Sequence, residues 1–264
     1  MSSEREIEAK LRVRSDAPEA VFARIASLRR LAGMALREVG SRRQRDLYWD
    51  TPAGALRARR AGLRLRWIGD AALPLLALKR DDAERGAEPG VIARSEWEVA
   101  WSQPAAAELA RRLGALGASP AAGAGAGADA PEAALRALGL EPLQERVTLR
   151  RALHALDPGG TPALELALDR VEFRLAARAL LHFEVELEAL APDVGPAQTA
   201  ALARALCREI GPELAPWSCN KLVLGQVLAE LLATPGALAL RASGAPDEAS
   251  YARVAAAAEE RFGR

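Results

Sequence analysis

The sequence is poor in the residues and runs that mark several classes of protein. Its 264 residues include only two cysteines, Cys207 and Cys219. They have no metal-ligand spacing, and so few thiols in a chain of this length indicate a reducing compartment. No stretch approaches the roughly 20 uninterrupted apolar residues of a membrane-spanning helix, and the first residues do not resemble a signal peptide. We therefore expect a cytoplasmic protein without a membrane partner.

An excess of one charge is missing as well. Lysine and arginine number 36 against 35 aspartate and glutamate, which leaves a net charge of +1. This balance gives no reason to expect nucleic acid as a partner. The only two histidines, His154 and His182, have no ligand spacing, so a structural role or an exposed position is favoured over a catalytic role for both. No phosphate-binding glycine loop or nucleophile elbow is present, because the Gly-Ala repeat at 123–127 lacks the flanking strand and helix.

What the sequence does contain is charged residues in alternation with apolar ones. Alternation with a period of two predicts strands, and apolar residues three or four apart predict helices. Strands are expected at 6–10, within 42–67, and at 75–80, 94–101, 146–154, 163–168, 171–175 and 181–190. Helices are expected from Pro18 onward, at 103–116 and at 196–210. The apolar segment 221–232 fits a strand or a helix equally well.

The number of charged strands predicts a closed sheet. Short connections between such strands favour an antiparallel sheet that closes into a barrel, since closure removes the edges and encloses a polar interior. Alanine, glycine and proline dominate the segment from about 119 to 131, which predicts a flexible loop. We expect one domain over residues 1–232, followed by a tail at 233–264. This tail carries a short helix and is interpreted as an appendage.

The pentapeptide Glu6-Ile7-Glu8-Ala9-Lys10 is the most informative of these strands. In a strand, Glu6, Glu8 and Lys10 share one face. Two adjacent carboxylates repel each other and favour a bound cation, while the lysine beside them suits an anion, so metal and phosphate together are the obvious pair. An ordinary amphipathic strand with a solvated face would show the same alternation, and that alternative stays open here.

Other strands carry charges that would share such an interior. The carboxylates are Glu6, Glu8, Glu96, Glu98, Glu165, Asp169, Glu184, Glu186 and Glu188, and the cations are Lys10, Arg64, Arg66, Lys79, Arg94, Arg150 and Lys221. A sheet with one face exposed to water would not need charged residues of both signs on so many of its strands. A barrel interior that holds divalent cations and a polyanion would need both, since carboxylates bind Mg²⁺ or Mn²⁺ and arginine and lysine bind phosphate oxygens.

In these residues the chain resembles the CYTH domain family, the triphosphate tunnel metalloenzymes. Glu6-x-Glu8-x-Lys10 is similar to the family's ExExK signature. The further motifs follow in the family's order over residues 1 to about 230: 45–52, 63–66, Leu78-Lys79, 94–98, 164–169 and the acidic ladder 184–188. Within the family, the chain is most similar to bacterial inorganic triphosphatases.

The resemblance implies an α+β fold, an eight-stranded antiparallel β-barrel with flanking helices, and a small-molecule triphosphate as substrate with Mg²⁺ or Mn²⁺ as cofactor. It implies metal ligands and phosphate contacts, with Glu6, Glu8 and Lys10 as the catalytic residues. The candidate metal ligands are Glu6, Glu8, Glu96, Glu98, Asp169, Glu184, Glu186 and Glu188. The implied substrate contacts are Lys10, Arg64, Arg66, Lys79, Arg94, Arg150 and Lys221. The chain departs from the family after Lys221, where Leu224, Gly225 and Gln226 stand in place of the arginine, glycine and tyrosine that family members commonly show, so the later cation is lost.

The hypothesis is a metal-dependent hydrolysis of inorganic tripolyphosphate to pyrophosphate and phosphate by in-line attack of water. An adenylate cyclase or a thiamine triphosphatase of the same family is an alternative. A polyphosphate- or nucleotide-binding module without catalysis is another. The sequence also leaves open whether the protein forms a homodimer.

Overall fold

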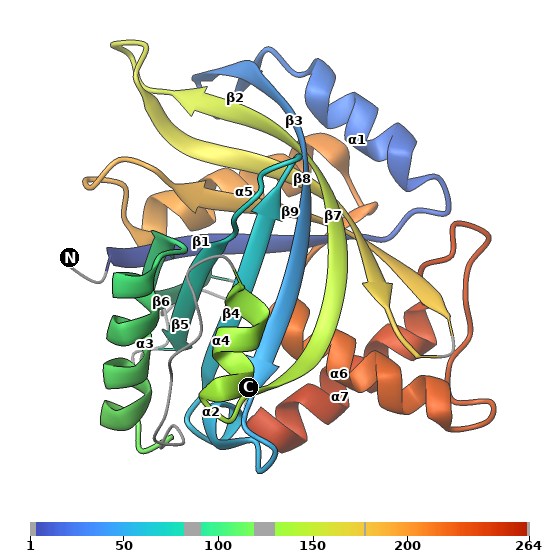
Figure 1. Ribbon diagram of the computed structural model, residues 1–264. Coiled ribbons are helices and arrows are strands. Elements are labelled where there is room, and N and C mark those ends of the chain that lie inside the picture. The colour runs from blue at the N-terminus through green and yellow to red at the C-terminus, as the bar shows by residue number, and fades with distance from the viewer. Residues whose placement is uncertain (1–3, 82–90, 119–129, 177, 263–264) are drawn as a thin grey trace. The chain divides into compact units, whose positions relative to one another are not determined.

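The computed structural model describes residues 4–81, 91–118, 130–176 and 178–262. Its strands form one sheet in the order β10-β1-β6-β5-β4-β3-β7-β8-β9, and β1 also pairs with β9. This last pairing closes a ring of eight strands, while the short β10 and β2 attach to β1 and β3. The predicted class, an α+β fold with an eight-stranded antiparallel barrel and flanking helices, is confirmed (Figure 1).

The elements have the following bounds. The strands are β1 (Glu4–Val13), β2 (Arg30–Leu31), β3 (Met34–Asp50), β4 (Ala61–Ile68), β5 (Leu75–Asp81), β6 (Val91–Ala100), β7 (Glu141–Leu156), β8 (Pro162–Arg174), β9 (Ala179–Ala189) and β10 (Leu214–Pro216). The helices are α1 (Pro18–Ser27), α2 (Ala55–Ala58), α3 (Gln103–Ala115), α4 (Pro131–Ala137), α5 (Pro196–Ile210), α6 (Lys221–Ala233) and α7 (Glu248–Phe262). The predicted loop at 119–131 lies mostly outside the described residues.

By its internal contacts the chain divides into two compact units, which are described separately. Unit 1 consists of Met1–Arg5, Arg43–Ala83 and Arg94–Val147. Unit 2 consists of Glu6–Arg42, Glu84–Ala93 and Thr148–Arg264. In each unit, one face of the strands packs apolar residues against helices, and this is the face that fixes the strands in place.

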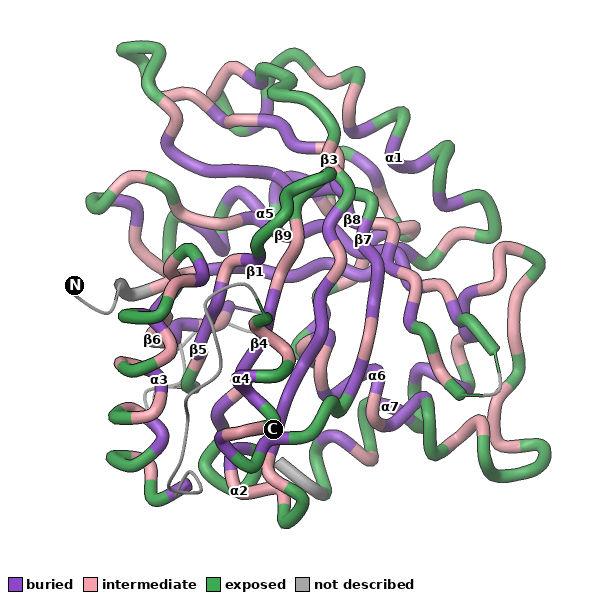
Figure 2. The backbone as a smooth tube through the Cα atoms, in the orientation of Figure 1, coloured by how far each residue is buried: buried purple, intermediate pink, exposed green. Residues whose placement is uncertain are grey.

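In unit 2, helices α1 and α5 cover that apolar face. The odd-numbered residues of β1 and β9, such as Leu11, Val185 and Leu187, are buried in one cluster with Ile25 and Leu206 of the helices. Figure 2 shows a continuous run of buried residues along most of β8. Because neighbouring side chains of a strand point to opposite faces, the even-numbered residues of β1 and β9 must lie on the other face. Those are the charged residues.

In unit 1, helices α3 and α4 play the same part. Leu63 and Leu65 of β4 and Trp97 of β6 are buried with Leu109 and Leu135 of these helices. The cluster leaves Arg64, Arg66, Glu96 and Glu98 on the opposite face of their strands by alternation. In this unit too, apolar packing on one side decides which charges share the other side.

The C-terminal segment does not stand apart as an appendage. Helices α6 and α7 lie side by side (Figure 1). Val223 and Leu228 of α6 and Tyr251 and Val254 of α7 are buried in one cluster with Phe173 of β8. The segment 221–232, which fitted a strand or a helix from its sequence, is the helix α6. The side chain of Asn220 caps this helix by accepting a hydrogen bond of 2.9 Å from the backbone N–H of Val223. The domain boundary at residue 232 stays a prediction.

Candidate functional site

The candidate site of unit 2 is built on three neighbouring strands, β1, β9 and β8. Their register places Glu8 opposite Glu188, and Glu188 opposite Glu165. The next rows set Lys10 opposite Glu186, and Arg12 opposite Glu184, which itself lies opposite Asp169. Directly opposed side chains share a face of the sheet, so the rows put carboxylates side by side. Because neighbouring carboxylates repel one another, this face requires cations beside them.

Lys10 and Lys221 supply two of these cations. The Lys10 ammonium donates to Glu8 at 3.2 Å and forms a close ion pair with Glu186. Lys221 also donates to Glu186, at 2.6 Å. It lies 3.0 Å from Asp169 and forms a close ion pair with Glu184. The side chains of both lysines are less than a tenth exposed, so these charges are shielded from solvent.

Arg150 of β7 supplies the third cation. Its guanidinium holds Asp169 through two bonds of 2.7 and 2.6 Å and donates to Glu186 at 2.6 Å. It also reaches Glu165 at 3.4 Å, and the partly exposed Arg42 donates to the same carboxylate at 3.0 Å. In this network Lys10, Lys221, Arg150 and Arg42 lie among five carboxylates, those of Glu8, Glu165, Asp169, Glu184 and Glu186.

The electrostatics of this network keep the carboxylates ionised. Burial by itself raises the pKa of Glu184, but the attraction of Lys221 and Lys10 outweighs it and holds this pKa well below the ordinary value. The pKa of Glu186 is likewise lowered, against its burial, by Lys10, Lys221 and Arg150. Burial lowers the pKa of Lys221, yet its three carboxylate neighbours raise it overall. The acidic groups are therefore available as anionic ligands at neutral pH.

Three of the carboxylates are close enough to share one metal ion. Asp169, Glu184 and Glu186 are buried, and one oxygen of each lies within 4.8 Å of the others. Among the described residues, this is the group of acidic, histidine or cysteine side chains that lies close enough together to hold one metal ion. Carboxylate oxygens are the donors that hard divalent cations prefer, so the donor set fits Mg²⁺ or Mn²⁺. We name Asp169, Glu184 and Glu186 the acidic triad.

Lys221 is placed at the acidic triad by the start of a helix. It is the first residue of α6, directly after the Asn220 cap. A cation in the first turn of a helix is unfavourable because the helix dipole is positive there. The ion pairs with Asp169 and Glu184 compensate for this. A residue that breaks a local preference and is stabilised by a distant cluster points to a functional constraint.

The candidate site of unit 1 is rich in arginine. Asp46 of β3 accepts two bonds from Arg66, at 2.7 and 2.8 Å, and two from Arg146, at 3.0 and 2.8 Å. Arg146 also donates to the hydroxyl of Tyr48 at 2.7 Å. Arg64 lies 3.8 Å from Asp46. One buried carboxylate is thus surrounded by three guanidinium groups, an arrangement that leaves donors for an additional anion.

The other charges of unit 1 continue from Arg64. This residue donates to Glu98 at 3.1 Å and lies 3.6 Å from Glu96. Lys79 of β5 lies 2.9 Å from the second oxygen of Glu96. Arg94 is buried on the same strand as both glutamates. Glu96 and Glu98 therefore pair with cations of their own unit, and their role as metal ligands stays a prediction.

Asp46 yields a test of the arginine-rich cluster. Although burial raises the pKa of Asp46, Arg66, Arg64 and Arg146 together hold it well below the usual value. A depressed pKa contributes stability above the unfolded value, about 3.9, and this contribution is lost as the pH falls through the folded value. We expect Asp46→Asn to lower the free energy of unfolding at pH 7 by about 3–5 kcal/mol, because Arg66 and the buried Arg146 lose the carboxylate that they bond, and the buried Arg64 loses a nearby charge. Urea unfolding at pH 7 and pH 3 measures the difference.

Glu108→Gln is the matched control, because Glu108 also pairs with arginines but lies on the surface of α3. We expect it to leave the unfolding midpoint unchanged at both pH values. The effect of Asp46→Asn should shrink at pH 3, because the Asp46 carboxyl of the unfolded wild-type chain then binds a proton while that of the folded protein stays ionised, which reduces the stability that the charge contributes. An effect of equal size at both pH values would show that the arginines do not act on its charge.

The structure brings together most of the candidate residues within their own unit. In unit 2, Glu8, Lys10, Arg150, Asp169, Glu184, Glu186 and Lys221 form one network, and in unit 1, Arg64, Arg66, Lys79, Glu96 and Glu98 join Asp46 or one another. Glu6 and Glu188 are half-buried on the strands that carry Glu8 and Glu186. Their roles, like those of the other candidates, remain proposals.

Several residues of these networks were missed from the sequence, among them Asp46, Arg146, His182 and Tyr251. Arg146 precedes Arg150 by four residues, so the period of two could have placed it on the same face of β7. His182, interpreted as structural, alternates with Glu184 and bonds its Oε2 at 3.0 Å. Tyr251 bonds His182 from the C-terminal helix at 2.8 Å, and no signal in the sequence could have found it. His154 lies 3.8 Å from Glu165.

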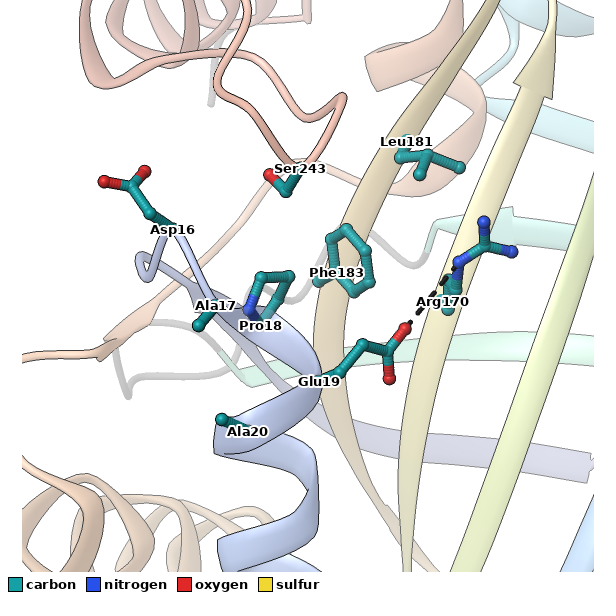
Figure 3. Close-up of a pocket in the computed structure, with 9 residues that line it drawn as sticks. All are labelled: Asp16, Ala17, Pro18, Glu19, Ala20, Arg170, Leu181, Phe183 and Ser243. Atoms are coloured by element: carbon teal, nitrogen blue, oxygen red, sulfur yellow. Dashed lines mark ion pairs between the residues drawn. The ribbon is translucent and has the colours of Figure 1, made fainter.

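A separate pocket of about 340 Å³ opens on the other face of β8 and β9 (Figure 3). Leu181 and Phe183 line it, and an ion pair of 3.7 Å joins Glu19 of α1 to Arg170. Because Leu181 and Phe183 alternate with His182 and Glu184, the pocket lies on the face of the sheet opposite the acidic triad. It therefore does not belong to the cluster of charges.

The fold and the buried charges define a class of protein, the antiparallel β-barrels whose strands bury charged side chains. The chain belongs to the CYTH domain family, whose model matches residues 4–206. No curated protein sequence matches the chain. None of the described helices has the length and apolar character needed to cross a membrane.

Solved structures share the fold. One is described as a putative adenylyl cyclase, HpAC1 from Hippeastrum, that reveals a dominant triphosphatase activity. It is 21% identical, with a TM-score of 0.52, over 84% of this chain and 95% of that one. Another is the PH1819 protein from Pyrococcus horikoshii OT3, 18% identical with a TM-score of 0.50, over 85% of this chain and 99% of that one.

Proposed function

We propose that the protein is a metal-dependent hydrolase of triphosphates and that its preferred substrate is inorganic tripolyphosphate, which it cleaves to pyrophosphate and phosphate. The observation that carries the proposal is the buried acidic triad in a chain of the CYTH family. Three buried carboxylates in contact with lysine and arginine suit a divalent cation and a polyphosphate at once. The triphosphatase activity described for HpAC1, whose fold the chain shares, favours hydrolysis.

Asp169, Glu184 and Glu186 would hold the metal, with Glu8, Glu188 and Glu6 as the further candidates from the same strands. A bound Mg²⁺ or Mn²⁺ supplies positive charge for the phosphate oxygens and lowers the pKa of a coordinated water. The side chains of the protein bind and orient the substrate. No covalent protein nucleophile is required for this chemistry, and no nucleophile motif was found in the sequence.

The cations of unit 2 have two functions in this proposal. In the structure, Lys10, Arg150 and Lys221 neutralise the carboxylates around them. When the carboxylates bind a metal, the same ammonium and guanidinium groups can turn to phosphate oxygens and stabilise the charge of the equatorial oxygens during transfer. Arginine is suited to this role, because its planar donors contact two oxygens at once.

The arginine-rich cluster of unit 1 supports binding of a polyanion. Arg66 and Arg146 bond the buried carboxylate of Asp46, and Arg64 lies between Asp46, Glu96 and Glu98, so several guanidinium groups share one face. Lys79 adds a further cation to the same face. We assign Arg64, Arg66, Lys79 and Arg94 to phosphate contacts, as the family resemblance implies, and add Arg146 to them on the basis of its contacts.

A substrate panel tests the proposal. Tripolyphosphate, ATP and thiamine triphosphate are each incubated with Mg²⁺ and with Mn²⁺, and released phosphate and cyclic AMP are measured. We expect phosphate release, fastest with tripolyphosphate, and its loss in Glu8→Ala. Cyclic AMP from ATP would support the cyclase instead, and tight binding of tripolyphosphate without release would support a binding module. Full activity of Glu8→Ala with Mg²⁺ would contradict the metal assignment.

The location and assembly of the protein stay predictions from the sequence. Cys207 and Cys219 are both free thiols, which fits the reducing compartment proposed for the chain. We propose a cytoplasmic enzyme that acts on a small molecule and has no membrane or nucleic acid partner. Its mass in solution would distinguish a monomer from a homodimer.

A further inference from the structure

The C-terminal helix α7 lies beyond residues 4–206, the range that matches the family model, but one of its side chains reaches the candidate metal centre. Tyr251 is 3% exposed. Its ring meets that of Trp217 edge-on, with the ring centres 5.6 Å apart. The guanidinium of Arg12 lies 4.1 Å from the centre of the same ring. These contacts and the burial of the ring restrict the direction of the Tyr251 hydroxyl.

Helix α7 is itself held firmly at its first turn. Glu248 accepts two bonds of 2.8 Å from Arg12, which lies on β1 two residues after Lys10. The hydroxyl of Ser250 bonds both the N–H and the carbonyl of Ala239, at 2.9 and 3.2 Å. Through these contacts, the strand that carries Glu8 and Lys10 also positions the C-terminal helix.

The hydroxyl of Tyr251 continues this contact to the acidic triad through His182. Tyr251 lies 2.8 Å from Nδ1 of His182, and Nε2 of the same ring lies 3.0 Å from Oε2 of Glu184. All three side chains are buried. An ionised carboxylate can only accept, so Nε2 carries the proton that bonds Glu184. In a neutral ring Nδ1 then accepts, and the hydroxyl of Tyr251 is the donor that fixes this tautomer.

We propose that Tyr251 is a positioning residue for the metal centre, acting through His182 to orient the Glu184 carboxylate toward a divalent cation shared with Asp169 and Glu186. The inference rests on the proposed function, because Glu184 is a metal ligand only there. Groups that orient a metal ligand from behind it typically contribute about 10–100-fold to metal affinity or activity. Helix α7 of the C-terminal segment thus contributes to a metal centre whose ligands lie on strands β8 and β9.

The experiment measures binding of Mn²⁺ to the full-length protein without substrate, by calorimetry and by the loss of the free Mn²⁺ electron paramagnetic resonance signal. The variant is Tyr251→Phe, which removes only the hydroxyl. We expect its Mn²⁺ dissociation constant to rise on the order of 10-fold. In a His182→Gln background the same change should alter affinity less than about twofold, since the two residues act in series.

Ser250→Ala is the matched control, because it loosens the first turn of α7 without touching His182. We expect it to lower the thermal unfolding temperature but to leave Mn²⁺ affinity unchanged. Equal losses of affinity in Ser250→Ala and Tyr251→Phe would overturn the proposal, as would unchanged affinity in Tyr251→Phe. A wild-type protein that binds no divalent cation would instead contradict the proposed function itself, so the two failures are distinguishable.

Discussion

Replacing Glu186 by glutamine is expected to reduce phosphate release roughly a hundredfold or more. Glu186 is the carboxylate on which the network of unit 2 converges, because Lys10, Lys221 and Arg150 all bond it. Glutamine keeps the size of the side chain but removes the charge, so one oxygen ligand of the acidic triad becomes a weaker neutral donor. Phosphate release from tripolyphosphate at saturating Mg²⁺ and Mn²⁺ measures the effect.

The same substitution should also lower the stability of the protein. Three buried cations would share one carboxylate fewer, and breaking a buried pair in this way costs about 3–5 kcal/mol. The control is Glu38→Gln, which removes an exposed glutamate bonded to Arg151. It should change neither activity nor the unfolding temperature. If Glu186→Gln retained turnover within about twofold of the wild type, Glu186 would have no place in the metal centre.

Replacing Lys221 by methionine is expected to make the stability of the protein depend on divalent cations. The ammonium of Lys221 contacts all three carboxylates of the acidic triad, those of Asp169, Glu184 and Glu186. Methionine retains the apolar stem, so the main loss is the charge. Without it, the carboxylates repel one another, and we expect a cost of about 3–5 kcal/mol. Thermal unfolding without metal should show a decrease of roughly 2–4 °C for each kcal/mol.

Added Mg²⁺ or Mn²⁺ should restore much of this stability, because the cation occupies the charge position that the ammonium has left. A ligand at a hundredfold excess over its dissociation constant contributes about 2.7 kcal/mol. The increase of the unfolding temperature should therefore be larger in Lys221→Met than in the wild type, whose carboxylates already have a partner. Phosphate release should fall, since Lys221 is also an assigned phosphate contact.

Arg151→Met serves as the control for this experiment, because it removes an exposed cation that pairs with Glu38. The metal should shift its unfolding temperature as much as that of the wild type. If divalent cations shifted Lys221→Met and the wild type equally, the ammonium and the metal would not share the acidic triad, and the metal would have to be placed elsewhere on the charged strands.

The strands and their faces were predictable because a strand repeats every two residues. The alternation around Glu8 and Lys10 and around Glu184 and Glu186 decided which side chains share a face, and register then brought these faces together. Errors arose where local signals were ambiguous. Segments 163–168 and 171–175 were expected as two strands, but β8 is continuous, because Asp169 points to Arg150 instead of marking a turn.

A helix was harder to predict where apolar residues occupy nearly all of its own sides. Helix α6 is apolar on nearly every side, so periodicity could not distinguish it from a buried strand, although Asn220 supplied a capping signal. The short helix α4 and strand β10 were missed because so few residues carry too little periodicity. Lys221 was already among the cations of the charged pattern, and the resemblance to the family then implied its role as a phosphate contact.

By itself, the sequence determined the charged faces of the strands and predicted a closed antiparallel barrel, because both follow from residue type and local spacing. The kind of chemistry was implied by the resemblance to the family and stays a proposal. Only the tertiary structure decided which charges are partners. His182 and Tyr251 are separated by 69 positions, and Lys10 and Glu186 by 176. Spacing in a strand or helix carries no information across such separations. Burial and ion pairing at the acidic triad, and the contribution of the C-terminal helix to it, depend on packing that brings these distant segments together.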